Sequence, residues 1–293
     1  MHEHTHHHDS SSQRIGWAFA LNVGFTVIEF VGGVLTNSTA IMADAVHDLG
    51  DSLSIGMAWV LGRQSGNKAD SSFTYGYKRL SLFGALINGL VLIAGSAWVL
   101  LQAIPRLFDP MMPAAEGMLA LAVLGVSVNG FAAYKLSAGT TLNEKVLNWH
   151  LLEDVLGWAA VLIVSIVLMI AEVPILDAML AIAFTLFILF NVVQYTWQAI
   201  KLFTQAVPEP GLIERVREEL LKITSVASMH HEHAWSLDGD STVYTAHLEI
   251  ASPMSAIEQV ELKSRIATIL QPFGFAHTTI ELELPKENCR DDA

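Results

Sequence analysis

The stretches ADAVHDLGD at residues 43–51 and WHLLED at residues 149–154 place polar side chains inside long apolar segments of this chain. Each holds a histidine followed four residues later by an aspartate, namely His47 with Asp51 and His150 with Asp154. Four residues along an α-helix turn the chain by about 400°, so each pair shares one helical face. Two such helices facing each other offer two imidazoles and two carboxylates, the donor set of a tetrahedral divalent cation, most naturally Zn²⁺.

The composition predicts an integral membrane protein. Of the 293 residues, 52% are hydrophobic and 15% are charged, which is too apolar for an ordinary soluble chain. The formal net charge of −13 argues against a nucleic-acid partner, because such partners select basic surfaces. Ionisable side chains are expensive inside a bilayer, so the paired motifs are a functional hypothesis by default.

Six apolar stretches have about the length that a helix needs to cross a bilayer. They run over Ile15–Thr36, Ala40–Leu61, Leu80–Gln102, Gly117–Tyr134, Val146–Ile170 and Leu176–Phe203. Eight Lys and Arg residues fall in segments on one side of the bilayer, whereas only Arg106 falls on the other. This asymmetry predicts that both termini are cytoplasmic, and we expect a bacterial inner-membrane location.

Three regions follow from this pattern. Residues 1–14 form a His-rich cytoplasmic tail, residues 15–207 form a six-helix transmembrane domain, and residues 208–293 form a cytoplasmic domain. The tail holds five histidines interleaved with Glu3 and Asp9, a composition that binds metals loosely. A disordered tail, a tag or a metal-gathering segment would each fit this sequence.

The C-terminal region is acidic, with 7 Lys and Arg against 15 Asp and Glu from residue 208 onward. Its periodicity predicts helices over Leu212–Ile223 and Ala256–Leu270, and strands over Val226–Leu237, Thr242–Ala251 and His277–Leu284. The order α-β-β-α-β indicates a small α+β sheet domain of the ferredoxin-like kind, with both helices on one face. We expect the single cysteine, Cys289, to take no part in function, because it lies in the polar C-terminal stretch.

Several stretches are similar to members of the cation diffusion facilitator family: Asn22–Gly33, Ser38–Asp51, Tyr75–Arg79 and His233–Leu237. With the six spans, the paired motifs on the second and fifth, and the cytoplasmic domain, they identify the chain as a family member over essentially its whole length. The resemblance implies a homodimeric secondary transporter, not an enzyme, that exports Zn²⁺ or a similar ion from the cytoplasm in exchange for protons. It also implies that the transported ion binds at one site formed by four residues, His47, Asp51, His150 and Asp154. This site would open alternately to the two sides of the membrane.

The same resemblance implies a regulatory metal site at the dimer interface of the cytoplasmic domains, formed by His230, His247, Glu281 and Glu283. Glu281 stands where some family members have histidine, which leaves the number of bound metals open. Strand alternation predicts that His230 faces away from His231 and His233, and that His247 points away from the packed face of its strand. His233 and His277 fit either a ligand or a packing role. The loop 63–78 lacks the histidines of a further family site, so we expect no metal site there.

Other intramembrane acids need separate interpretations. Asp44 is one turn before His47 and can accept its ring N–H, whereas Asp48 is turned by about 100° and suggests packing or an ion entry path. Glu153 is three residues from His150 and is a candidate to contact that histidine rather than the ion itself. Two more acids, Glu29 and Asp177, are expected to face the bundle in structural or pathway roles, because lipid would penalise them.

Rival classes lack their motifs in this sequence. It contains neither the His-Glu-x-x-His stretch of a zinc protease nor the glycine-rich loop of a nucleotide-driven pump. A sensor that signals without transport needs no metal ligands at bilayer depth on two helices. An importer would differ only in direction. The two histidines favour Zn²⁺, with Cd²⁺, Co²⁺ and Ni²⁺ as alternatives, whereas an all-oxygen quartet would suit Mn²⁺ better.

Overall fold

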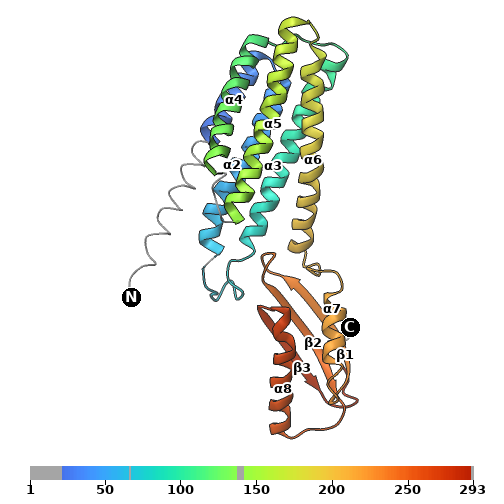
Figure 1. Ribbon diagram of the computed structural model, residues 1–293. Helices are drawn as coiled ribbons and strands as arrows, with labels where there is room; N and C mark the ends of the chain where they lie inside the picture. Colours follow the sequence, from blue (N-terminus) through green and yellow to red (C-terminus); the bar gives the residue numbers. More distant parts are fainter. Residues whose placement is uncertain (1–21, 66, 137–141, 292–293) are drawn as a thin grey trace, which may run out of the picture. The chain divides into compact units, whose positions relative to one another are not determined.

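The computed structural model describes residues 22–65, 67–136 and 142–291, which fall into two compact units (Figure 1). The first unit comprises the described residues up to Ala58 together with Ile87–Thr196, and the second comprises Trp59–Leu86 and the described residues from Trp197 on. The predicted His-rich tail, residues 1–14, and the predicted start of the first span lie outside the described residues.

Long apolar helices build the first unit, as the sequence predicted. A helix over Asn22–Thr36 is followed by α2 (Thr39–Ser65), α3 (Leu80–Ala103), α4 (Ala115–Leu136), α5 (Leu142–Ile170) and α6 (Ile175–Phe203), with a short helical turn η1 (Pro105–Leu107) after α3. One end of each of α2, α3 and α6 extends into the second unit. Segments within α3 to α6 are each long and apolar enough to cross a membrane. The α2 helix has the length but is interrupted by three acids in its first half. A helical membrane domain is therefore confirmed.

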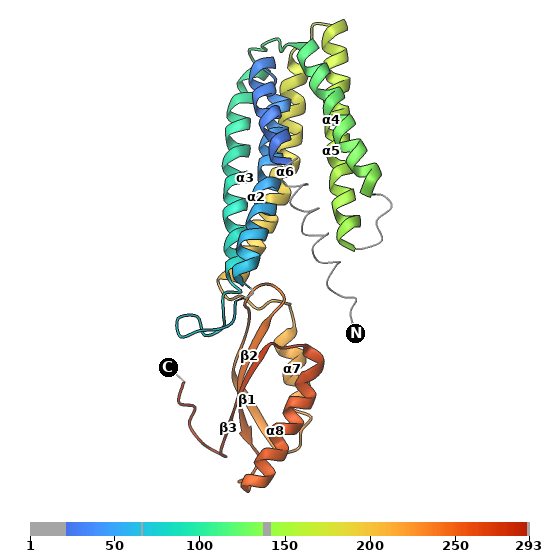
Figure 2. The same ribbon diagram turned by 90° about the vertical axis from the view of Figure 1, so that its left-hand side faces the viewer.

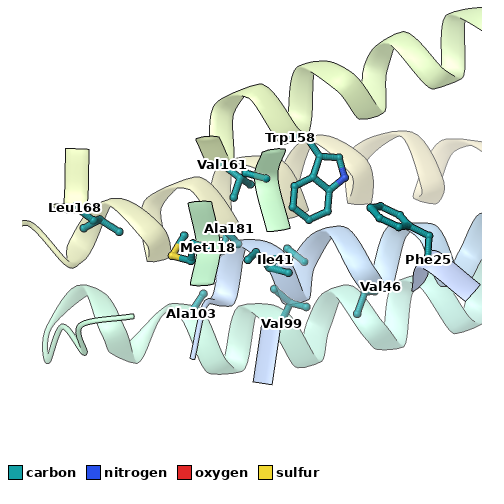
Figure 3. Packing of buried hydrophobic residues seen from close by; sticks show 13 residues of the cluster. Phe25, Ile41, Val46, Val99, Ala103, Met118, Trp158, Val161, Leu168 and Ala181 are labelled. Carbon is teal, nitrogen blue, oxygen red and sulfur yellow. The ribbon is translucent and has the colours of Figure 1, made fainter. Parts of the chain in front are cut away.

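The core of this unit forms where these helices meet (Figure 3). Trp158 of α5 is 1% exposed, and its ring meets Phe25 of the first described helix edge to face at 5.8 Å between centroids. Ile41, Val99 and Met118 bring side chains of α2, α3 and α4 into the same cluster. This cluster therefore joins α2, α3, α4 and α5 with the first described helix.

Glycine at position 125 lets α4 and α5 pack closely, and the two helices lie side by side in both views (Figures 1 and 2). A Cβ at Gly125 would overlap the indole ring of Trp158, whereas one at Gly130 would only touch Val155 at 4.0 Å. We expect Gly125→Ala to destabilise the folded protein by about 1–3 kcal/mol, the usual cost of overpacking. Thermal unfolding in detergent measures this, with Gly130→Ala as the matched control. Equal unfolding temperatures for the two variants would contradict the close-packing argument.

Asp177, predicted to face the bundle, caps a helix from a distant part of the sequence. It is 2% exposed at the start of α6, and its carboxylate accepts hydrogen bonds from the Thr39 amide and hydroxyl, both at 2.7 Å. The Ser38 hydroxyl donates to it at 2.6 Å, and the Ala40 amide at 3.3 Å. Because α2 has no acid in its own first turn, Asp177 supplies the negative charge that stabilises its N-terminus.

The second unit contains the predicted α-β-β-α-β order. Its elements are α7 (Leu212–Leu220), β1 (Val226–Ser236), β2 (Thr242–Ile250), α8 (Ala256–Leu270), a short turn η2 (Gln271–Phe273) and β3 (His277–Glu283). The sheet order is β1-β2-β3, with β1 antiparallel and β3 parallel to β2. Figure 2 shows α7 and α8 on one face of the sheet and the chain after β3 on the other.

Alternation along the central strand decides which side chains enter the core of this unit. Tyr244, Ala246, Leu248 and Ile250 are each at most 2% exposed and pack against the helices. Glu232 is buried beside them, where it accepts hydrogen bonds from Arg217 Nε at 2.7 Å and the Tyr244 hydroxyl at 3.0 Å. Burial, with Glu232 nearby, raises the pKa of the Tyr244 phenol. The intervening His247 is thereby directed to the opposite face of the sheet.

The prediction that His230 faces away from His231 was wrong. The ladder between β1 and β2 shifts register between His230 and His233, and His231 adopts a left-handed backbone with φ of 53°. This bulge breaks the alternation. As a result, the rings of His230 and His231 both lie near the His247 ring, at 5.6 and 4.9 Å between centroids.

Candidate metal centres

The first candidate centre lies on one face of α2. His47 Nε2 is 3.5 Å from Asp51 Oδ2, one helical turn away, and both side chains are about one fifth exposed. The His47 ring meets Phe184 of α6 edge to face, and it borders a narrow crevice lined also by Ser96 of α3. An imidazole and a carboxylate held this close, and still partly accessible, can bind one divalent cation together.

Asp48 is closer to this pair than its position in the helix suggests. Ligand atoms of His47, Asp48 and Asp51 all lie within 4.8 Å of one another, although Asp48 itself is 4% exposed. A carboxylate on a neighbouring face can reach the same point, because its side chain spans part of the angle between the two faces. Helical spacing alone predicts a role in packing or in an ion entry path for Asp48, whereas these distances make it a further donor candidate.

The α5 helix contributes Asp154, which is 7% exposed. Its carboxyl interacts electrostatically with Asp44 and Asp48 of α2, so the acid of α5 lies toward the acidic face of α2. His150 belongs to α5, but its side chain lies outside the described part of the structure. Glu153 is exposed, which separates it from the buried acids.

Two further buried acids surround the α2 motif. Glu29 is fully buried and interacts electrostatically with Asp44, Asp48 and Asp154. Asp44 is 3% exposed and faces α5, where a Cβ on Gly157 would lie 3.7 Å from its Oδ1. Clustered buried carboxyls repel one another when ionised, and a divalent cation or protons relieve that repulsion. The supporting acids of the sequence analysis are therefore gathered around one place, except Asp177, which caps α2.

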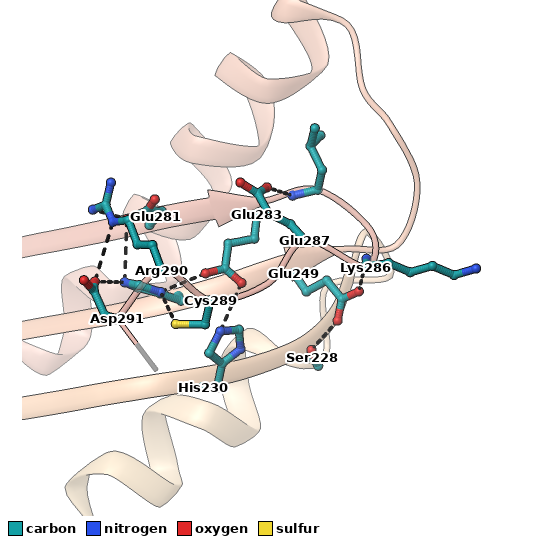
Figure 4. A network of polar contacts seen from close by, with 12 residues as sticks. Ser228, His230, Glu249, Glu281, Glu283, Lys286, Glu287, Cys289, Arg290 and Asp291 are labelled. Carbon is teal, nitrogen blue, oxygen red and sulfur yellow. Dashed lines mark hydrogen bonds and ion pairs between the residues drawn. The ribbon is translucent and has the colours of Figure 1, made fainter. Parts of the chain in front are cut away.

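A second candidate centre lies on the open face of the sheet (Figure 4). His230 of β1 is paired with His247 of β2, which is paired in turn with Glu281 of β3. Glu283 Oε1 is hydrogen-bonded to His247 Nδ1 at 2.8 Å, and Glu283 Oε2 lies 3.0 Å from His230 Nε2. His247 and Glu283 are buried, at 7% and 3% exposed, so the four residues predicted from sequence meet on one face.

Two details of this centre escaped the sequence analysis. Glu281 Oε2 is 3.6 Å from His247 Nε2, but Arg290 Nη2 lies closer to the same oxygen, at 2.6 Å. Cys289, expected to be uninvolved, has its Sγ 3.4 Å from His247 Nδ1. Ligand atoms of His230, His247, Glu283 and Cys289 all lie within 4.8 Å of one another. Two imidazoles, a carboxylate and a thiol at that spacing fit the donor set of a transition-metal ion.

Asp70, in the loop before α3, accepts hydrogen bonds from within that loop. Asp70 accepts hydrogen bonds from the Tyr77 hydroxyl at 2.6 Å and from the amides of Ser72 and Phe73, both at 2.8 Å. These bonds, the one from Tyr77 first, hold the pKa of the Asp70 carboxyl below its usual range. Both carboxylate oxygens of Asp70 are thus engaged in hydrogen bonds within the loop.

Comparison with known proteins agrees with this architecture. Residues 17–203 match the cation efflux transmembrane domain, and residues 208–284 match the cation efflux protein cytoplasmic domain. A zinc transporter ZitB of Pectobacterium atrosepticum is 29% identical, over 99% of this chain and 91% of its own length. A cadmium, cobalt and zinc/H⁺-K⁺ antiporter of Bacillus subtilis is 26% identical over 97% and 93%.

The metal cation efflux system protein CzcD of Cupriavidus metallidurans is 29% identical, over 96% of this chain and 90% of its own length. Because the two family matches cover both units, the resemblance drawn from the sequence is confirmed. The chain belongs to the cation efflux family, the cation diffusion facilitators, and is a membrane transporter of transition-metal cations rather than an enzyme.

Proposed function

We propose that the protein exports Zn²⁺ from the cytoplasm in exchange for protons. The ion binds between α2 and α5, at His47, Asp51, His150 and Asp154, and both termini are cytoplasmic in an inner membrane. The observation that carries the proposal is the His47–Asp51 pair, 3.5 Å apart, with the buried Asp154 interacting with the same acidic face of α2. Cd²⁺, Co²⁺ and Ni²⁺ suit the same donors.

Reversible transport follows from the chemistry of the donors. Nitrogen and oxygen ligands release a borderline metal more readily than thiolates do. Imidazole titrates near neutral pH, and a bound metal excludes the proton from the ligating nitrogen. Arrival of protons on one side therefore expels the metal, and their loss on the other side readmits it. The surrounding carboxyls of Glu29, Asp44 and Asp48 repel one another when ionised, so the site without metal is destabilised unless protons bind there.

The cytoplasmic unit regulates this cycle in a homodimer. Metal binding on the open sheet face, at His230 and His247 with the acids of β3, draws together two acidic domains that otherwise repel. A ligand that binds one arrangement better than another shifts the population toward it, here toward the arrangement that transports. Support comes from the buried, closely spaced donors on that face.

Zinc flux into proteoliposomes under an imposed pH gradient tests the proposed function. We expect wild-type protein to drive Zn²⁺ movement against its own gradient when protons flow the opposite way, and to stop when an ionophore collapses the gradient. Flux without any response to pH would retain a carrier but contradict proton exchange. No flux of Zn²⁺, Cd²⁺, Co²⁺ or Ni²⁺ would contradict the proposal as a whole and favour a metal sensor.

A further inference from the structure

The last described residues of the chain lie over the sheet face opposite α7 and α8, and no part of the proposed function uses them. We propose that Cys289 completes a closed metal site with His230, His247 and Glu283, all within one subunit. We further propose that metal binding fastens the C-terminal segment 285–291 over the sheet. The inference rests on the proposed cytoplasmic regulatory site and deepens it by naming its fourth ligand.

The donor atoms converge from four different parts of the chain. His230, His247 and Glu283 come from β1, β2 and β3, and Cys289 comes from the segment after β3. Their adjacent ligand atoms are separated by 2.8 to 3.4 Å along the chain of contacts His230–Glu283–His247–Cys289. Metal–ligand bonds of about 2.0–2.3 Å in a tetrahedron put neighbouring ligand atoms about 3.3–3.8 Å apart. Small side-chain adjustments therefore suffice to enclose one ion.

Burial explains why these groups require a cation. The side chain of Glu283 is 4% exposed, and within the described ranges both of its ion-pair partners are histidines. A cation bound at the same point stabilises a carboxylate that is buried away from water and from Lys or Arg. A divalent ion bound by all three residues is such a cation.

Arg290 pairs with one of the two carboxylates on this face of β3 and leaves the other, Glu283, available to bind metal. Its guanidinium lies 2.6 Å from Glu281 Oε2 and 3.6 Å from Asp291 Oδ2 (Figure 4). Glu281, the other acid on this face of β3, is thus neutralised by the residue that directly follows Cys289. The C-terminal segment therefore pairs Glu281 with Arg290 and places the Cys289 thiol next to His247. Cys289 takes the coordination position that the family resemblance assigned to Glu281.

The path of the C-terminal segment is fixed by hydrogen bonds around a turn at Lys286, whose φ is 66°. The Lys286 amide donates to Glu249 Oε1 at 3.0 Å, and the Leu284 amide donates to Glu287 Oε2 at 2.7 Å. The Lys286 amide and the Ser228 hydroxyl together lower the pKa of the Glu249 carboxyl. The turn sends the chain back over the sheet face opposite the helices (Figure 2) and brings Cys289 to His247.

A thiol in the ligand set predicts the class of metal. On binding, Cys289 loses its proton to solvent and the thiolate donates to the ion, which favours Zn²⁺ and Cd²⁺ over hard cations such as Mg²⁺ and Mn²⁺. Four protein ligands leave no open position, as in structural rather than catalytic sites. Such a site holds its ion more firmly than the oxygen and nitrogen quartet proposed between α2 and α5.

Because Cys289 is the only cysteine in the chain, thiol chemistry reports on this site alone. Full-length protein in detergent is stripped with a chelator, mixed with Zn²⁺ or Cd²⁺, and treated with a chromogenic thiol reagent. We expect either ion to slow modification at least about tenfold, and Mg²⁺ to leave it unchanged. With Cd²⁺ we also expect an ultraviolet thiolate-to-metal charge-transfer band, which Cys289→Ser removes.

Variants separate ligation from simple shielding of the thiol. His230→Ala, at a half-buried position, and Glu283→Gln should each raise the metal concentration needed for protection at least about tenfold. His233 is on the same strand but exposed, so His233→Ala is the matched control. In this variant, metal should protect Cys289 at the same concentration as in wild type. Metal bound by the cytoplasmic unit with equal affinity in wild type and Cys289→Ser, without a charge-transfer band, would overturn the inference.

The readout is independent of transport, so the two proposals fail separately. Protected Cys289 in a preparation without flux would support this inference and count against the proposed exporter. Proton-driven flux with Cys289 equally reactive in the presence and absence of Zn²⁺ would overturn this inference and leave the exporter standing.

Discussion

Replacing Asp51 or Asp154 with alanine is expected to reduce proton-driven Zn²⁺ flux to the level of empty liposomes. Each change removes a carboxylate that would ligate the ion, and the remaining donors no longer balance its charge inside the membrane unit. Asp154 is 7% exposed, so a water molecule replaces it poorly, whereas Asp51 is one fifth exposed. We therefore expect Asp154→Ala to be at least as severe as Asp51→Ala.

Glu153 provides the matched control for this measurement. It precedes Asp154 on α5 but is exposed, so Glu153→Gln should transport like wild type. Size-exclusion profiles and unfolding temperatures of all variants establish that the loss of flux is not a loss of folding. Wild-type flux in Asp154→Ala would remove α5 from the site, and the trio of His47, Asp48 and Asp51 on α2 would then remain as the ion's ligands.

Asp177→Ala is expected to destabilise the membrane unit strongly. Its carboxylate accepts four hydrogen bonds, from the Ser38 hydroxyl, the Thr39 amide and hydroxyl, and the Ala40 amide. Hydrogen bonds to a charged group contribute about 1.5–3 kcal/mol each, so losing two or more without replacement costs about 3–6 kcal/mol. The N-terminus of α2 would loosen, and the folded yield would fall.

Thermal unfolding in detergent measures this effect. Asp109 lies in an exposed connection before α4, and Asp109→Ala should unfold like wild type. Asp177→Asn keeps one of the two acceptor oxygens but loses the other and the charge, so its unfolding temperature should fall between those of wild type and Asp177→Ala. An alanine variant as stable as wild type would show that the cap contributes nothing to holding α2 in place.

Local patterns determined much of the architecture. Apolar runs of bilayer length predicted the helices, and period-two and helical spacing predicted the α-β-β-α-β order of the second unit, with strand ends within a residue or so. The step of four residues placed His47 and Asp51 on one face of α2, as the structure has them. These features depend on residues a few positions apart, so a short stretch of sequence is enough to predict each helix or strand and the side chains that share its face.

Only the tertiary structure decided which distant groups meet. Asp177 reaches Thr39 across 138 residues of chain, and no spacing in the sequence marks that contact. The bulge at His231 overrides strand alternation, because a single left-handed residue shifts every following side chain to the other face. Cys289 comes to His247 because the turn at Lys286 reverses the chain over the sheet. Sequence periodicity specifies the elements and their faces, whereas closure of the chain in space selects the partners.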